Sequence, residues 1–217
     1  MLLDTCLPSS ITDSITIRAR TRKDLPAVVQ LAKRVYAPPH PPEAIWQEET
    51  LLSHLSAFPE GQLVVENSEG RIIADSSALR VSTREAFAGH TWHGITGCGA
   101  LNTHQPQGEV FYGVDIMVDP QVQGRGIGQQ LYHARKRLAR ELGCRFFIAG
   151  ARIPGFNLTA NGLSVEAYVR DVISMRRFDP TLSRQLKAGF TVMGILPNYF
   201  RDFESRDFAV LICLPII

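Results

Sequence analysis

The chain has 217 residues, of which 45% are hydrophobic and 20% are charged, and its formal net charge is +2 at pH 7. This composition is typical of a globular protein with one well-filled core, and the near balance of charge gives no electrostatic reason to expect a nucleic-acid or membrane partner. Its four cysteines, Cys6, Cys98, Cys144 and Cys213, are scattered without a C-x-x-C pair. They therefore indicate neither a disulfide framework nor a zinc site, and we expect a reduced, cytoplasmic protein.

The first half of the chain predicts strands and helices in alternation after a short tail. Residues 1–13 form an N-terminal tail, and residues 14–217 form a single domain. The expected elements are a strand at 14–20, an amphipathic helix at 21–38 that Pro38 and Pro39 end, a helix at 41–59, and two strands at 61–67 and 71–82 joined by a hairpin turn. Residues 83–108 lack regular periodicity, and we interpret them as a long functional loop with short extended pieces.

The second half continues the pattern. Its expected elements are a strand at 109–118, a helix at 127–143, a strand at 144–151, a helix within 164–175, a helix at 179–190 that Asp179 caps, and strands at 190–196 and 206–214. This order indicates a mixed α/β domain and not a regular βαβ array.

Three glycines lie between the strand at 109–118 and the helix that follows it. Gly124, Gly126 and Gly128 fall within the segment VDPQVQGRGIGQQLYHARKR. Glycine permits a tight corner, and the free N–H groups of a helix start bind phosphate well. The dinucleotide pattern G-x-G-x-x-G fails because Gln129 or Leu131 occupies its last position, and no P-loop pattern is present. The alternative is a tight turn that binds nothing.

This segment resembles motif A of the GNAT family of N-acetyltransferases, Gln/Arg-x-x-Gly-x-Gly/Ala after a strand that ends Val-x-Pro. Gln123, Gly126 and Gly128 match the motif, with Val118 and Pro120 upstream. The segments ITIRARTRKDLPAVVQLA and LKAGF resemble the family's first strand and helix and the Gly-Phe that ends its fourth helix. The segments TWHGITGCGALNTHQPQGEVFYGVDIMVDP and GARIPGFN also resemble the acetyltransferase module that some bacteria fuse to a nitrilase-like amidohydrolase.

The resemblance implies a GNAT-like (acyl-CoA N-acyltransferase) fold, with a mixed, mostly antiparallel central sheet flanked by helices. It implies acetyl-CoA as co-substrate and no metal, with pantetheine along the fourth strand and pyrophosphate on the glycine corner. The residues it implies for acetyl-CoA binding are Ile116, Met117, Val118, Gln123, Gly124, Arg125, Gly126, Ile127 and Gly128. The expected reaction is direct attack of an amine on the thioester in a ternary complex.

An alkylammonium has a pKa near 10, so a base must remove its proton. Asp115, Glu109 and His104 are the alternatives for this base. In the family a tyrosine often protonates the leaving thiolate, and Gln185 stands at its position here. Either Tyr112 or Tyr199 substitutes for it as the general acid, or no acid is required because a thiolate leaves readily.

The acceptor side is expected to come from the two long excursions, residues 83–108 and 152–177. Thr103 and His104 in one, and Arg152 and Asn157 in the other, offer polar groups for a small-molecule or peptide amine. The second excursion is equally interpreted as a homodimer contact, because Val165, Tyr168, Val169 and Val172 form an apolar side. The first excursion also holds residues of the types that bind zinc, but their spacing fits no known zinc pattern. They are His90, His93, Cys98 and His104.

A run of basic residues is interpreted as a solvated helix face, and one of its members is expected to touch the 3′-phosphate of CoA. The run consists of Arg135, Lys136, Arg137 and Arg140.

Together with the motif resemblance, these observations predict an acetyl-CoA-dependent N-acetyltransferase. The alternatives are a non-catalytic acetyl-CoA sensor and a partner subunit of a separate amidohydrolase.

Overall fold

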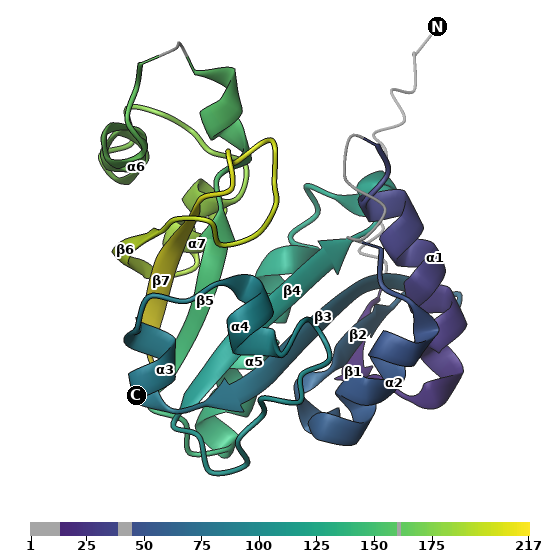
Figure 1. The fold of residues 1–217 in the computed structure, drawn as a ribbon. Helices are drawn as coiled ribbons and strands as arrows, with labels where there is room; N and C mark the ends of the chain where they lie inside the picture. Colours follow the sequence, from purple (N-terminus) through teal and green to yellow (C-terminus); the bar gives the residue numbers. More distant parts are fainter. Residues whose placement is uncertain (1–13, 39–44, 160–161) are drawn as a thin grey trace, which may run out of the picture.

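A computed structural model describes residues 14–38, 45–159 and 162–217. The predicted tail, Pro39 and the first residues of the second predicted helix lie outside these ranges. Within them, seven strands form one sheet in the order β1-β2-β3-β4-β5-β7-β6. Only the β4–β5 pair is parallel. The predicted mixed, mostly antiparallel sheet is therefore confirmed (Figure 1).

The elements follow the predicted order closely. Their bounds are β1 (Thr16–Ala19), α1 (Leu25–Val35), α2 (Glu48–Ala57), β2 (Leu63–Glu66), β3 (Ile72–Val81), α3 (Thr83–Phe87), α4 (Trp92–Thr96), β4 (Val110–Val118), α5 (Ile127–Glu141), β5 (Phe146–Arg152), α6 (Val165–Ile173), α7 (Leu182–Lys187), β6 (Thr191–Leu196) and β7 (Ala209–Pro215). The prediction of a loop with extended pieces at 83–108 is wrong, because this excursion holds helices α3 and α4. Helix α7 begins at Leu182, a little after the predicted start, and Asp179 Oδ1 accepts hydrogen bonds from the amides of Thr181 and Leu182, as predicted for a capping residue.

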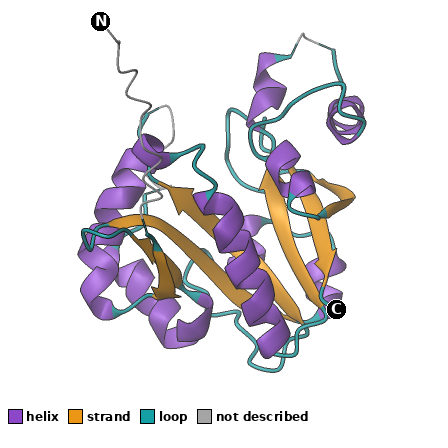
Figure 2. Cartoon of the chain, turned by 180° about the vertical axis from the view of Figure 1, so that it is seen from behind, coloured by secondary structure: helices purple, strands orange, loops and turns teal. Residues whose placement is uncertain are grey.

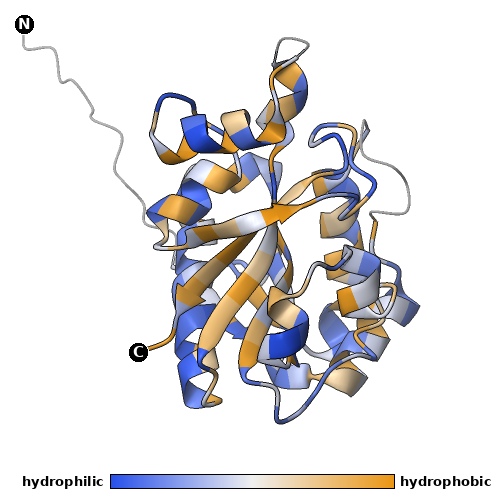
Figure 3. Cartoon of the chain, turned by 60° about the vertical axis from the view of Figure 1, so that its left-hand side comes forward, coloured by the Kyte–Doolittle hydropathy of each residue, from blue (hydrophilic) through white to orange (hydrophobic). Residues whose placement is uncertain are grey.

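Helices cover both faces of the sheet. Figure 1 shows α4 on the near face, and Figure 2, which views the chain from behind, shows α5 across the opposite face. Side chains of successive strand residues point to opposite faces of the sheet, because a strand is pleated, and so they pack alternately against the helices of the two faces. On β2, Val64 packs in the cluster of α1, whereas Val65 packs in the cluster of α5. Figure 3 shows the resulting concentration of apolar residues along the strands.

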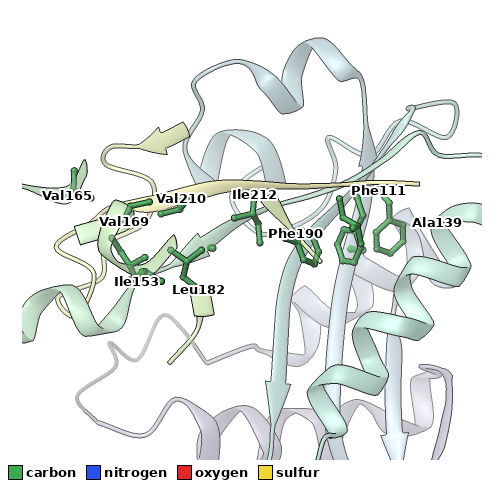
Figure 4. Packing of buried hydrophobic residues seen from close by; sticks show 14 of the residues in the cluster. Phe111, Ala139, Ile153, Val165, Val169, Leu182, Phe190, Val210 and Ile212 are labelled. Atoms are coloured by element: carbon green, nitrogen blue, oxygen red, sulfur yellow. The ribbon is translucent and has the colours of Figure 1, made fainter. Parts of the chain in front are cut away.

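The apolar side of helix α6 packs against the core of its own chain. Val165, Tyr168, Val169 and Val172 are all buried in the largest core cluster. Figure 4 shows Val165 and Val169 in this cluster, which includes Ile153, Leu182 and Val210. The apolar side that suggested a dimer contact is therefore occupied within the chain, and that interpretation loses its basis.

A buried ion pair joins Arg20, directly after β1, to Asp75 on β3 and also contacts α2. Arg20 donates hydrogen bonds to both carboxylate oxygens of Asp75, at 2.8 and 3.0 Å, and neither side chain is exposed. The same guanidinium contacts the Gln62 side-chain oxygen at 3.1 Å and the His54 ring at 3.3 Å. Burial raises the pKa of Asp75 to about 6, although Arg20 opposes this shift.

Candidate active site

The parallel pair β4–β5 parts halfway along its length. Its ladder runs from Val110 opposite Phe146 to Gly113 opposite Ala149. Strand β4 continues to Val118 and β5 to Arg152. Figure 1 shows the two strands diverging beyond this point. We call this divergence the splay; it leaves strand backbone without its sheet neighbour, available to a ligand that lies between the strands.

A β-bulge in β4 lies at the start of the splay. On β3, Ser77 lies opposite Asp115 and Ala78 lies opposite Gly113, so Val114 is the extra residue on β4. A bulge bends its strand and increases its twist. The bulge therefore accounts for β4 turning away from β5 directly after Gly113.

The glycine corner lies at the end of β4. Gly124 and Gly126 have φ values of +80° and +81°, a region that favours glycine, and Gly126 is the N-cap of α5. An added Cβ on either residue would meet no atom within 4 Å, so each glycine is required for its backbone angle and not for space. Gln123 supports the corner by donating from Nε2 to the Val118 carbonyl at 3.0 Å.

This corner has the geometry of an anion site. Residues 123–126 are all exposed, and no side chain caps the start of α5 in the described chain. The first N–H groups of the helix, at the positive end of its dipole, therefore have no capping side chain among the described residues and adjoin an exposed turn.

Asp119 holds the corner to its neighbours and was not singled out from the sequence. Its carboxylate accepts from Arg34 on α1 at 3.0 Å and from Arg71 at 2.8 Å. Burial alone would raise the pKa of Asp119, but the Gln121 amide and the two guanidinium groups together lower it. Asp119 thus stays ionised and connects α1, β3 and the corner.

Asp115 lies on β4 within the splay, and its side chain is hydrogen-bonded on both oxygens. Tyr36 Oη donates to Oδ1 at 2.5 Å, Trp46 Nε1 donates to Oδ2 at 2.7 Å, and the Ile116 amide donates to Oδ1 at 2.8 Å. Asp115 therefore connects β4 to the end of α1 and to the start of α2, on the face opposite α5.

Tyr112 and Tyr199 meet where β4 and β5 part. Their hydroxyl oxygens lie 2.9 Å apart. A Cβ added to Gly150, the first β5 residue after the ladder, would lie 2.5 Å from Tyr199 Oη. Burial raises the pKa of both tyrosines, while the Gly150 amide opposes the shift. Both are thus neutral hydroxyls at physiological pH, next to the splay.

Arg135 contradicts the prediction of a solvated helix face, because its side chain is 2% exposed. It packs between the rings of Phe111 and Phe147 and donates to the Ser77 carbonyl at 3.1 Å, beside the bulge. Burial lowers the pKa of Arg135 to about 10, although Asp115 and Asp75 are among the groups that raise it. Gly113 makes room for it, since a Cβ there would lie 2.7 Å from the guanidinium.

The family is decided by comparison with known proteins. The sequence profile of the Acetyltransferase (GNAT) family matches residues 25–163. The chain belongs to this family.

Relatives and solved structures agree with this membership. The chain is 35% identical over 199 residues to uncharacterized N-acetyltransferase YkwB of Bacillus subtilis (strain 168), covering 92% of this chain and 88% of YkwB. It is 40% identical over 188 residues to probable hydrolase YhcX of the same organism, covering 87% of this chain but only 36% of YhcX. The chain thus spans about a third of the length of YhcX.

The fold is shared with solved GNAT-like structures. The GphF GNAT-like decarboxylase, solved in complex with isobutyryl-CoA, superposes with a TM-score of 0.78 at 24% identity, covering 93% of this chain and 100% of GphF. The loading GNATL domain of CurA from Lyngbya majuscula also gives a TM-score of 0.78, at 18% identity, covering 94% of this chain and 98% of that domain. The predicted GNAT-like fold and the prediction of an N-acetyltransferase are confirmed at the level of the family.

This GNAT chain does not gather all the predicted site residues. His104 accepts from the Arg80 amide at 3.0 Å and stacks on Phe58 over β3, and Thr103 donates to the Ile95 carbonyl at 2.6 Å. Glu109 is exposed at the start of β4, where Thr83 and Arg145 contact it. These three residues lie away from the splay, because Arg80 pairs with Phe111 and Glu109 directly precedes Val110, both at the paired end of the strands.

Arg152 lies at the other end, where β5 finishes. It donates to both oxygens of Asp202, at 2.7 and 2.8 Å, and to Glu204 at 2.9 Å. The Asn157 amide donates to the Glu204 carbonyl at 3.0 Å, so Asn157 and Arg152 share a neighbour. Gln185 is buried in α7 and is no acid. The described residues hold no group of three potential metal ligands, and no helix among them is long and apolar enough to cross a bilayer.

Proposed function

We propose that this GNAT chain transfers the acetyl group of acetyl-CoA to a primary amine by direct attack in a ternary complex. The observation that carries the proposal is the splay of β4 from β5 beside an uncapped, glycine-rich helix start. Solved relatives with the same fold hold CoA thioesters: GphF is in complex with isobutyryl-CoA, and YncA of Salmonella typhimurium is a structure with its cofactor acetyl-CoA.

The pyrophosphate of acetyl-CoA binds the amides from Gly124 to Gly128, with Gln123 supporting the turn and Arg125 and Ile127 between the glycines. Pantetheine lies along β4 beside Ile116, Met117 and Val118. The Ile116 amide already donates to Asp115 Oδ1 at 2.8 Å, so a pantetheine carbonyl would share that donor. An N–H of this segment stabilises the oxyanion of the tetrahedral intermediate.

Of the proposed catalytic residues, Asp115 and Tyr112 lie at the splay, whereas His104 lies over β3. Among the proposed acceptor contacts, Arg152 and its neighbour Asn157 lie at the open end of the splay, and Thr103 is engaged with the Ile95 carbonyl. The acceptor therefore approaches on the α1–α4 face, where Asp115, Trp46 and Tyr36 meet.

Asp115→Asn should lower turnover about tenfold while leaving acetyl-CoA affinity close to that of the wild type. An amide offers one acceptor oxygen where the carboxylate offers two, so the Trp46 N–H or the Tyr36 hydroxyl loses its partner. Thiol release measures turnover, and calorimetry measures affinity. Unchanged turnover over the whole pH range would remove Asp115 from the acceptor side.

Release of free CoA from acetyl-CoA across an amine panel tests the function itself. The panel holds n-butylamine, 1,4-diaminobutane, a mixture of free amino acids, and a lysine-containing peptide with a free N-terminus. We expect at least one amine to accelerate thiol release, with the acetylated product seen by mass spectrometry. Acetyl-CoA binding without turnover on any amine would favour the non-catalytic sensor, and co-purification with a separate amidohydrolase would favour the partner subunit.

A further inference from the structure

Three side chains form a hydrogen-bonded series that ends at the splay. His90 Nε2 lies 2.8 Å from Tyr112 Oη, and Tyr112 Oη lies 2.9 Å from Tyr199 Oη. Tyr112 is fully buried and Tyr199 is 4% exposed, whereas the His90 ring is only half-buried. The series therefore connects solvent at His90 with the point where β4 and β5 part.

The hydrogen-bond partners fix the direction of the series. His90 Nδ1 lies 2.8 Å from the Ala88 carbonyl, which accepts only, so Nδ1 carries the hydrogen. In the neutral ring Nε2 is then a free acceptor, and the Tyr112 hydroxyl donates to it. The Tyr112 oxygen is left to accept from Tyr199. Both hydroxyl hydrogens thus point toward His90, which is the arrangement for moving a proton away from the splay.

The sequence-based candidates for the base are all occupied. Both oxygens of Asp115 accept hydrogen bonds, from Tyr36 and Trp46. His104 Nδ1 accepts from a backbone amide, and Glu109 forms an exposed ion pair with Arg145. His90 Nε2, in contrast, has only a hydroxyl donor, and a hydroxyl can pass its proton on.

We propose that His90 takes up, through Tyr112 and Tyr199, the proton that the acceptor amine loses as it attacks the thioester. The inference rests on the proposed function. The amine proton moves to Tyr199 Oη, the Tyr199 proton to Tyr112 Oη, and the Tyr112 proton to His90 Nε2. The nitrogen lone pair forms the C–N bond, and the electrons of the breaking C–S bond leave on sulfur as CoA thiolate. The imidazolium then releases its proton to water. Tyr199 is the catalytic residue of this series, and Tyr112 and His90 act through it.

The surroundings of His90 favour its neutral form. The titratable groups that face its ring are Tyr112 from β4 and Tyr199 from the segment between β6 and β7. Burial lowers the pKa of His90, the Ala88 hydrogen bond opposes this, and no charged side chain of the described residues is among the causes. His90 is therefore unprotonated at Nε2 at neutral pH and can accept a proton there. It loses this ability as the pH falls through its lowered pKa.

The direction of the series is tested without any acceptor. Nitrogen-15 NMR of histidine-labelled wild-type protein at pH 7 should show His90 with a hydrogen on Nδ1 and none on Nε2. The Tyr112→Phe variant should shift the Nε2 resonance, because it removes the hydroxyl that donates to it. A hydrogen on Nε2 in the wild type would overturn the proposal.

The role in the reaction is tested with whichever amine of the four-member panel turns over. We expect His90→Ala to lower kcat about a hundredfold, within the usual range for a proton-transfer group. KM, CoA affinity and melting temperature should stay close to the wild type, and added imidazole should restore kcat. The double variant His90→Ala with Tyr112→Phe should lose no more than the single variant.

The matched control is His133→Ala, an exposed histidine on α5 that should leave kcat unchanged. In the wild type, log kcat should fall at low pH as His90 becomes protonated. This fall should be absent from the pH profile of the Tyr112→Phe variant, in which His90 no longer receives the proton. A kcat in His90→Ala close to that of the wild type, or a loss that imidazole leaves unchanged, would overturn the proposal. If no amine turns over, the proposed function has failed, and the NMR result alone decides the direction of the series.

Discussion

Gly126→Asp is expected to weaken acetyl-CoA binding about a hundredfold or more, because a carboxylate next to a pyrophosphate costs several kcal/mol. Gly126 is the N-cap of α5, and the space around its Cα is open. An aspartate there fits sterically and, among non-glycine residues, tolerates a positive φ comparatively well. Its charge would occupy the place where phosphate should bind, and its oxygens would take the helix amides that phosphate should use.

The matched control is Gly126→Asn, which has the same shape and the same backbone tolerance but no charge. We expect Asn to weaken binding far less than Asp, and isothermal calorimetry with acetyl-CoA measures both. Thermal unfolding of the two variants shows that each is folded. Equal affinities in the Asp and Asn variants would mean that no phosphate lies at this corner.

Asp75→Ala is expected to lower the free energy of unfolding by about 3–5 kcal/mol, the usual cost of leaving a buried charge without its partner. Arg20 would stay fully buried with its main anionic contact removed, and its Nε already has no hydrogen-bond partner among the described residues. Urea denaturation followed by circular dichroism measures the loss.

A second Asp–Arg pair provides the control for this loss. Asp171 pairs with Arg176 at 2.7 Å, but the Arg176 side chain is 63% exposed. Asp171→Ala removes the same kind of contact at the surface, where water replaces it, and should leave the urea midpoint unchanged. Equal effects of the two substitutions would show that the Arg20–Asp75 pair is not the buried support of β1 and β3 described above.

The glycine corner was predictable from the sequence because its signals are local. A strand that ends Val-x-Pro and two glycines that require positive φ lie within a few residues of one another, and the backbone angles of Gly124 and Gly126 agree with that requirement. Helix α3 was missed although its signal is equally local. Ser82 and Glu85 form a capping box, with the Ser82 side chain accepting from the Glu85 amide at 3.2 Å.

The burial of Arg135 was also visible in the helical period. Leu131 and Ala139 lie four residues on either side of Arg135, and both are fully buried, so the arginine falls on the apolar side of α5. The run of basic letters around it suggested a solvated face instead. His90 and Tyr199 have no such signal, because Tyr112 and Tyr199 are 87 residues apart and only the sheet brings their hydroxyls together.

A crystal structure of this chain with CoA would show whether the cofactor binds at the glycine corner and in the splay. We expect pyrophosphate oxygens within hydrogen-bond distance of the amides from Gly124 to Gly128, pantetheine beside β4 at Ile116 to Val118, and the thiol near Tyr199 where the strands part. CoA bound elsewhere on the protein, with the glycine corner and the splay both empty, would contradict it.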